Sequence, residues 1–226
     1  KIMAITGANS GIGLECVKQF LTDGWHVSAI SRKSNNLANL TPNDKLDIYE
    51  CDVTNYTALQ GVVDCIIAKH KVIDGLINNA GVSFYSELQD LKHSEIQDMI
   101  DINVKGLTNA LEIIIPIMQK NKSGTVLNMS SLADRYPRPN SPVYAATKAY
   151  VRSISDSLRV SCAKYNIRVM NLSPATVNTP LLHNVRKMDS GYIEVADFVS
   201  VIKFMFNQPH NITIRDLVIA PTAYEG

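Results

Sequence analysis

The chain contains few cysteines, no excess of either charge and no long hydrophobic run. Its four cysteines are widely spaced, form no Cys-x-x-Cys motif and build no metal-type pattern with histidine. Because all four fall in apolar or strand-like segments, we expect buried free thiols, which suit a reducing cytoplasm. No metal site is predicted. The cysteines are Cys16, Cys51, Cys65 and Cys162.

The balance of charge excludes several classes of partner. Lys and Arg number 22 and Asp and Glu 21, so the net charge is +1. Without a basic surplus, neither nucleic acid nor an anionic membrane surface is an expected partner. The most apolar run, Ala110–Met118, is short and contains Glu112 and Pro116, so no membrane span is expected. Lys1–Thr6 leads directly into structured sequence, so no secretory signal is expected either.

Short apolar runs alternate with longer amphipathic segments along all 226 residues, 46% of which are hydrophobic. Strands alternating with helices predict right-handed βαβ units. We therefore predict one α/β domain over residues 1–226, doubly wound and of Rossmann type, with about seven parallel strands and helices on both faces. The predicted strands are Lys1–Thr6, Val27–Ser31, Asp47–Cys51, Gly75–Asn78, Gly124–Met129, Arg168–Leu172 and Leu217–Ala220. The predicted helices are Ile12–Leu21, Thr57–His70, Ser94–Met118 (opened by a capping box at Ser94–Gln97), Val143–Tyr165 and Glu194–Phe206.

A glycine-rich loop follows the first predicted strand. Thr6-Gly7-Ala8-Asn9-Ser10-Gly11-Ile12-Gly13 runs directly into the first helix. Glycines let the backbone approach a ligand closely, and the helix N-terminus offers free N–H groups and a positive dipole end. The pattern predicts a pyrophosphate site, the alternative being a turn that binds nothing.

A tyrosine and a lysine lie four residues apart in Tyr144-Ala145-Ala146-Thr147-Lys148, and Ser131 precedes the tyrosine by thirteen residues. On a helix this spacing places the phenol and the ammonium on one face. A cation lowers the pKa of a nearby phenol, and a serine hydroxyl can hydrogen-bond a substrate oxygen. Tyr144 is therefore a candidate proton donor, Lys148 a candidate for lowering its pKa, and Ser131 a candidate for polarising a substrate oxygen. An exposed Tyr/Lys pair without function would have the same spacing.

Taken together, these motifs resemble the short-chain dehydrogenase/reductase family across residues 6–180. The glycine spacing is Gly-x-x-x-Gly-x-Gly, and Cys51-Asp52-Val53, Asn78-Asn79-Ala80-Gly81 and Asn103 follow in the family's order. The resemblance implies hydride transfer between a nicotinamide and a carbonyl or alcohol. It implies that Tyr144 protonates the alkoxide, Ser131 stabilises it, Lys148 binds the nicotinamide ribose and lowers the pKa of Tyr144, and Asn103 holds a water of a proton relay.

The same resemblance implies a set of dinucleotide contacts, in which Asn78 lies beside the adenosine site. Asp52 has a second interpretation as a simple turn residue. The chain departs from the family at Ala175, where glycine is usual, so the backbone there is either ordinary or turned differently. The predicted contacts are Gly7, Asn9, Ser10, Gly11, Ile12, Gly13, Ser31, Arg32, Asp52, Val53, Asn79, Ala80, Gly81, Tyr144, Lys148, Pro174, Val177 and Thr179.

The end of the second strand selects between NADP and NAD. NAD enzymes place a carboxylate there, whereas a basic group accommodates the 2′-phosphate of NADP. Counting from Gly13, that position is the uncharged Ser31, followed by Arg32 and Lys33. Arginine grips phosphate with paired charge-assisted bonds, so we expect NADPH and keep NAD as the alternative.

The substrate is less defined by the sequence. Residues 181–192 are predicted to form a short lid carrying His183, Arg186 and Lys187, and Arg135 and Arg138 lie nearby in the chain. These cations either recognise a carboxylate, as in the bacterial 3-hydroxy acid dehydrogenases that the chain resembles, or face solvent. A 3-hydroxy acid or a small carbonyl compound is the predicted substrate.

Other classes of function remain open. The fold also serves catalytically silent dinucleotide-binding regulators and scaffolds, which the intact Ser131, Tyr144 and Lys148 disfavour. A nucleic-acid-binding module is disfavoured by the near-neutral charge. By resemblance, the long helices over Ser94–Met118 and Val143–Tyr165 are expected to mediate a homodimer or homotetramer.

Overall fold

The structure, a computed structural model, describes residues 1–183 and 191–224. Its centre is a seven-stranded sheet with the order β3-β2-β1-β4-β5-β6-β7, and every neighbouring pair is parallel. This confirms the predicted doubly wound α/β fold with seven parallel strands. The strands are β1 (Ile2–Thr6), β2 (His26–Ser31), β3 (Leu46–Glu50), β4 (Gly75–Asn78), β5 (Gly124–Met129), β6 (Ile167–Pro174) and β7 (Asp216–Ile219).

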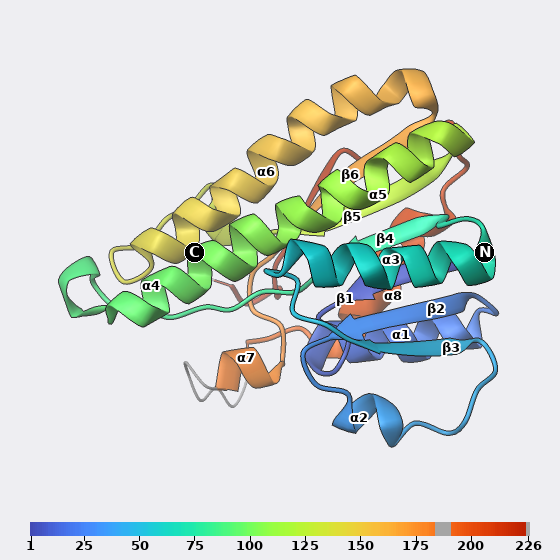
Figure 1. Cartoon of the computed structure of the whole chain (residues 1–226). Helices are drawn as coiled ribbons and strands as arrows, with labels where there is room; N and C mark the ends of the chain where they lie inside the picture. The colour runs from blue at the N-terminus through green and yellow to red at the C-terminus, as the bar shows by residue number, and fades with distance from the viewer. Residues whose placement is uncertain (184–190, 225–226) are drawn as a thin grey trace.

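Helices cover both faces of the sheet (Figure 1). One buried cluster joins α3, α5 and α6 to the sheet, and a second joins α1 and α8 to the opposite face. The helices are α1 (Gly11–Thr22), α2 (Asn35–Ala38), α3 (Tyr56–His70), α4 (His93–Ile100), α5 (Leu107–Asn121), α6 (Pro142–Cys162), α7 (Pro180–His183) and α8 (Val195–Asn207).

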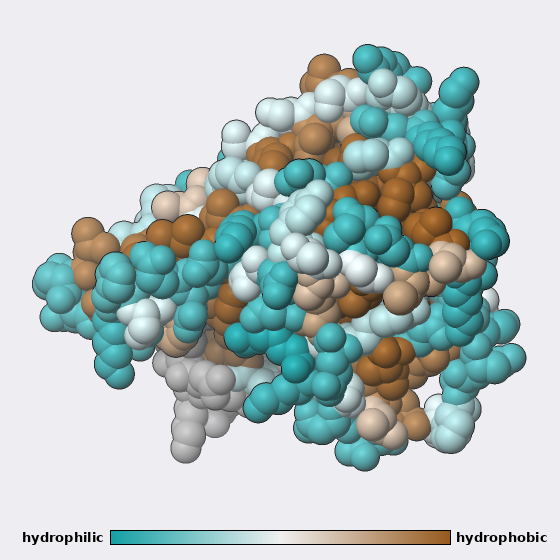
Figure 2. Space-filling view, in the orientation of Figure 1, coloured by the Kyte–Doolittle hydropathy of each residue, from teal (hydrophilic) through white to brown (hydrophobic). Residues whose placement is uncertain are grey.

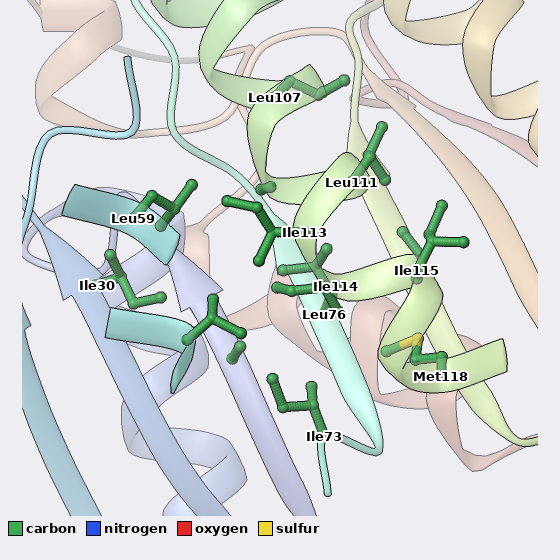
Figure 3. Close-up of a cluster of buried hydrophobic side chains, with 14 of the residues drawn as sticks. Ile30, Leu59, Ile73, Leu76, Leu107, Leu111, Ile113, Ile114, Ile115 and Met118 are labelled. Carbon is green, nitrogen blue, oxygen red and sulfur yellow. The ribbon is translucent and has the colours of Figure 1, made fainter. Parts of the chain in front are cut away.

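The two apolar layers explain why the strands carry near-continuous hydrophobic runs. A parallel sheet buried on both faces needs apolar side chains at successive positions. In Figure 3, Ile113 and Ile114 of α5 face Leu76 of β4, while Ile30 of β2 lies beside Leu59 of α3. Each such fully buried side chain contributes about 1.5–3 kcal/mol relative to exposure.

The surface seen from the same side is mostly hydrophilic. Hydrophobic side chains gather on it over α5 and α6, whereas the region of α2 and α3 is mainly polar (Figure 2). Within the described part of the chain, no helix is both long enough and apolar enough to cross a membrane.

Two local predictions were wrong. The helix expected over Ser94–Met118 is interrupted by a π-helical turn, Asp101–Gly106, and it begins at His93. Its N-cap is Lys92, whose backbone N–H donates to Glu95 Oε2 at 2.9 Å, so the capping box lies two residues earlier than expected. Cys65 is exposed, because it lies on the solvent side of α3; the other three cysteines are buried free thiols.

Thr6, the last residue of β1, joins β1 to β4 where the strand order reverses. Its buried hydroxyl donates to Asn78 Oδ1 at 3.3 Å and accepts from the N–H groups of Asn79 and Ala80 at 3.0 and 3.1 Å. The Asn79 amide donates in return to the carbonyls of Thr6 and Gly7 at 3.1 and 3.3 Å. In open α/β sheets, ligands bind at the carboxyl ends of the strands at this reversal.

We therefore expect Thr6→Val to lower the free energy of unfolding by about 1–3 kcal/mol, since two partly buried N–H groups lose their acceptor. Urea denaturation measures the change. Ser28→Ala is the matched control, because the Ser28 hydroxyl is buried without a hydrogen-bond partner among the described residues. Equal destabilisation by the two substitutions would contradict the role given to Thr6.

Candidate active site

The glycine loop adopts backbone conformations that only glycine takes easily. Gly7 has a φ of +66° and Gly11 a φ of +50°. A Cβ added to Gly7 would lie 2.8 Å from the Ala80 Cα, and one added to Gly13 would collide with the Gly7 carbonyl oxygen. Ser10 caps α1 through its backbone position but makes no side-chain capping bond within the described structure. The first turn of α1 thus keeps N–H groups that an anion can use.

A cleft of about 610 Å³ opens beside this loop, at the carboxyl ends of β1, β2, β3 and β4. Most predicted dinucleotide contacts line it: Gly7, Asn9, Ser10, Gly11, Ile12, Ser31, Arg32, Asp52, Val53, Asn79, Ala80, Gly81 and Thr179. Gly13, Pro174 and Val177 do not line it, and neither do Tyr144 and Lys148. The prediction missed Cys51, Val82, Ile102, Pro180 and Leu181 as lining residues, although each is next to a predicted residue or lies in the predicted lid; Lys33 also lines the cleft.

The end of β2 presents hydroxyl and cationic groups to the cleft. Ser31 is buried, and its hydroxyl donates to the carbonyl of Lys33. Arg32 and Lys33 are exposed. Asn9 is held in place by α2, because its carboxamide oxygen accepts from the N–H groups of Asn36 and Leu37 at 2.9 and 3.2 Å. The cleft therefore has a rigid wall at the loop and a basic rim beside β2.

Ser131, Tyr144 and Lys148 come together from two elements. Ser131 follows β5 and caps a short 3₁₀ turn, and its hydroxyl accepts from the Ala133 N–H at 3.2 Å. Tyr144 and Lys148 lie one turn apart on α6 and are 7% and 6% exposed. The Lys148 ammonium lies 5.7 Å from the Tyr144 ring centroid and donates to the Met129 carbonyl at 2.9 Å.

Burial shifts the pKa values of both Tyr144 and Lys148. Burial raises the pKa of Tyr144, and hydrogen bonds from Ser131 and Tyr85 lower it only in part. Burial also lowers the pKa of Lys148 to about 8, against the attraction of Asp134. The Lys148 ammonium donates to the Met129 carbonyl, and the lowering of the Tyr144 pKa by Lys148 stays a prediction.

Tyr85 is a neighbour of the site that the sequence did not reveal. Its ring centroid lies 5.5 Å from that of Tyr144, with an interplanar angle of 44°. Tyr85 is 42% exposed, but partial desolvation and the hydrogen bond to Tyr144 raise its pKa, as expected for the donor of that bond. No motif marks Tyr85, since it lies in a loop whose path only the fold defines.

Asn103 lies in the π-helical turn, and its buried carboxamide hydrogen-bonds to the loop after β4 and to α6. Its oxygen accepts from the Val82 N–H at 2.8 Å, and its nitrogen donates to the Val82 carbonyl at 2.8 Å and to Thr147 Oγ1 on α6 at 3.1 Å. A Cβ on Gly81 would lie 3.2 Å from Asn103 Oδ1 and 3.7 Å from Lys148 Nζ. Gly81 lines the cleft, so Asn103 and Lys148 lie directly behind the cleft wall.

A buried carboxylate supports the same region. Asp134 Oδ2 accepts from the hydroxyls of Ser130 at 2.9 Å and Ser173 at 2.6 Å. Arg135 Nε donates to Asp134 Oδ1 at 2.6 Å, and its Nη1 lies 2.9 Å from Asp216 Oδ2. These hydrogen bonds lower the pKa of Asp134 although burial raises it.

Among the predicted substrate cations, Arg135 differs from both alternatives, whereas Arg138 is exposed. Arg135 is bound to Asp134 and Asp216, so it neither faces solvent nor is free to bind a substrate carboxylate. Arg138 donates to the Tyr224 hydroxyl at 3.0 Å. Arg186 and Lys187 lie outside the described residues, as does most of the predicted lid, and His183 is described only as the last residue of α7.

The segment after β6 keeps an ordinary backbone at Ala175. Positive φ outside glycine occurs among the described residues at Lys71, Lys122 and Asn166, not there. The Ala175 N–H donates to the Ile219 carbonyl at 2.7 Å, so the alanine is accommodated without strain. Pro174 ends β6, Val177 is buried in a bridge with Ile193, and Thr179 lies at the cleft beside Gly11.

The strand order, the glycine loop and the cleft define a Rossmann-type fold. The family model of the short chain dehydrogenases matches residues 1–190. An oxidoreductase of Staphylococcus saprophyticus is 31% identical over 237 residues, which cover 99% of this chain and 96% of the relative. The chain belongs to the short-chain dehydrogenase family.

Solved structures agree with this assignment. A serine dehydrogenase complexed with NADP+ has a TM-score of 0.95 and 27% identity, with coverage of 100% of this chain and 98% of that chain. A 3-ketoacyl-(acyl-carrier-protein) reductase from Brucella melitensis complexed with NADH has a TM-score of 0.91 and 26% identity, with coverage of 98% and 97%. The two proteins carry different dinucleotides, so the likeness does not select between them.

The shifted pKa of Lys148 makes a prediction about stability. The ordinary pKa is 10.5 and the folded one about 8, so between these values the unfolded chain binds more protons and stability rises with pH. Relative to Lys148→Met, the wild type should gain about 3 kcal/mol of unfolding free energy from pH 7.5 to pH 10.5. Urea denaturation across that range measures it, with the exposed Lys105→Met as control. Parallel curves for the wild type and Lys148→Met would contradict the buried-ammonium interpretation.

Proposed function

We propose that this protein is an NADP(H)-dependent oxidoreductase that interconverts an alcohol and a ketone or aldehyde by hydride transfer. One observation carries the proposal: Lys148, one helical turn from Tyr144 and buried like it, lies directly behind the wall of a cleft lined by a glycine loop, and Ser131 hydrogen-bonds to Tyr144. Gly81 connects the cleft to Lys148, because it lines the cleft and a Cβ built on it would lie 3.7 Å from Lys148 Nζ.

The residues present fit a dinucleotide. Gly7 and Gly13 pack against neighbouring backbone so closely that no Cβ fits, which shapes the loop beside the cleft, and the N-terminus of α1 offers N–H groups to the pyrophosphate. Asp52 and Val53 would lie by the adenine, and Asn79, Ala80 and Gly81 would line the adenosine side. The bound cofactor supplies the hydride chemistry; the protein supplies orientation and the proton.

We assign proton donation to Tyr144. A pKa raised by burial keeps the phenol protonated near neutrality, so it can donate to the oxygen of a carbonyl being reduced. The Ser131 hydroxyl, hydrogen-bonded to the same phenol, would stabilise the developing negative charge on that oxygen. Lys148, with a pKa of about 8, would bind the nicotinamide ribose, and Asn103 would hold its surroundings rigid.

NADPH is the proposed dinucleotide because the end of β2 offers Ser31, Arg32 and Lys33 to the cleft. A 2′-phosphate would gain a charge-assisted hydrogen bond from Arg32.

Arg32→Gln should therefore raise the KM for NADPH about tenfold or more, because it removes a charged hydrogen bond, and should leave the KM for NADH nearly unchanged. Steady-state kinetics with both cofactors measure the effect. Lys45→Gln, an exposed lysine outside the cleft, is the control. A wild-type preference for NADH would refute the proposed cofactor.

A small 3-hydroxy acid or its oxo partner is the proposed substrate class. Support comes from the likeness to a serine dehydrogenase, since serine carries its hydroxyl on the β-carbon. Arg135 is excluded as the carboxylate receptor by its ion pairs, which leaves Arg138 and the lid cations as candidates.

Tyr144→Phe should reduce turnover about 10²–10⁴-fold, the usual contribution of a general acid, while NADPH binding stays intact. The assay follows NADP(H) absorbance with serine, other 3-hydroxy acids, small aldehydes and apolar ketones, and cofactor binding is followed by fluorescence. Tyr150→Phe is the matched control: Tyr150 lies on the same helix, and its hydroxyl pairs with Thr108 at 2.8 Å.

Near-normal turnover in Tyr144→Phe would refute its role. NADPH binding without turnover on any substrate of the panel would favour the catalytically silent alternative. Activity confined to apolar ketones would refute the proposed 3-hydroxy acid substrate but not the proposed reaction.

A further inference from the structure

Two histidines and an aspartate converge far from the cleft. His26 is the first residue of β2, Asp47 lies at the start of β3, and His70 ends α3. The amino ends of the two strands and the C-terminal end of the helix lie together at the right of Figure 1. The cleft opens at the other ends of these strands, roughly 17 Å away at 3.3 Å per residue along β2.

The ligand-type atoms of the three residues lie within 4.8 Å of one another. Asp47 Oδ2 is 2.7 Å from His70 Nε2 and 3.5 Å from His26 Nε2. The two imidazole rings lie 4.2 Å apart between centroids. Zinc bound by histidine nitrogen and carboxylate oxygen has bonds of about 2.0–2.2 Å, so ligand atoms spaced in this way need only small movements to share one ion.

One ligand atom lacks a hydrogen bond. His26 Nε2 is buried and has no hydrogen-bond partner among the described residues, although it points toward the shared carboxylate oxygen. A buried polar atom without a partner is costly, and a metal ion at this point would satisfy it.

The two oxygens of Asp47 have separate partners. Oδ2 faces both imidazoles, whereas Oδ1 forms an ion pair with Lys69 Nζ at 2.5 Å. Lys69 is 52% exposed in its side chain, so its ammonium can stay on Oδ1 or withdraw into solvent. Without a metal, the same atoms form a simple hydrogen-bonded cluster at the end of α3.

We propose that His26, Asp47 and His70 bind one divalent transition-metal ion of the zinc type. Two imidazoles and one carboxylate are a ligand set that suits Zn²⁺, with solvent completing the coordination. The ion would link β2, β3 and α3, so its effect is on the stability of this edge of the sheet and not on hydride transfer. Sequence spacing does not reveal the site, because its ligands are separated by more than twenty residues each.

The test uses the full chain without a histidine tag, stripped of metal, in a Cys65→Ser background that removes the exposed thiol. Calorimetry with Zn²⁺ and visible absorption with Co²⁺ measure binding, and thermal unfolding measures stability with and without Zn²⁺. We expect one equivalent per chain and a metal-dependent rise in Tm. His26→Gln and His70→Gln should each weaken binding about 100-fold, and the exposed His93→Gln should bind like the parent.

The variant Lys69→Met distinguishes a metal site from a cluster that is only hydrogen-bonded. It removes a competing cation from Asp47 at an exposed position, so Zn²⁺ should bind several-fold more tightly. Weaker binding in this variant would overturn the proposal. So would the absence of saturable one-equivalent binding by the parent, or binding that survives the double variant His26→Gln/His70→Gln.

Discussion

The hydroxyl of Thr6 is the interaction on which the arrangement of the cleft depends. It is wholly buried between β1 and β4, and it accepts the N–H groups of Asn79 and Ala80 while donating to Asn78. These bonds fix the segment after β4 against the glycine loop at the reversal of strand order. Gly7 can approach Ala80 so closely only because it has no Cβ, which would lie 2.8 Å from the Ala80 Cα.

The polar groups behind the cleft are buried and therefore depend on one another. Asp134 accepts hydrogen bonds from the hydroxyls of Ser130 and Ser173 and from the guanidinium of Arg135. Asn103 hydrogen-bonds to both Val82 and Thr147 of α6. A half-satisfied buried network would be destabilising, so each partner restricts the others. The same burial raises the pKa of Tyr144 and lowers that of Lys148.

Sequence periodicity and motif order predicted most of the fold and most of the cleft lining. Every predicted strand is present within two residues of its bounds, because a sheet covered on both faces needs continuous apolar runs. The break at Asp101–Gly106 was missed, since the apolar period continues through it while Asn103 bonds to Val82. Arg135 was misplaced for a similar reason: its partner Asp216 lies eighty-one residues away.

The sequence by itself determined the alternation of strands and helices, the glycine loop and the pairing of Tyr144 with Lys148, because each depends on neighbours close along the chain. Only the tertiary structure decided which side chains are desolvated and which meet from distant segments. It placed Tyr85 against Tyr144, bound Arg135 to Asp216 and brought His26, Asp47 and His70 together. Burial and long-range contact set pKa values and ligand geometry, and neither has a signature in local sequence.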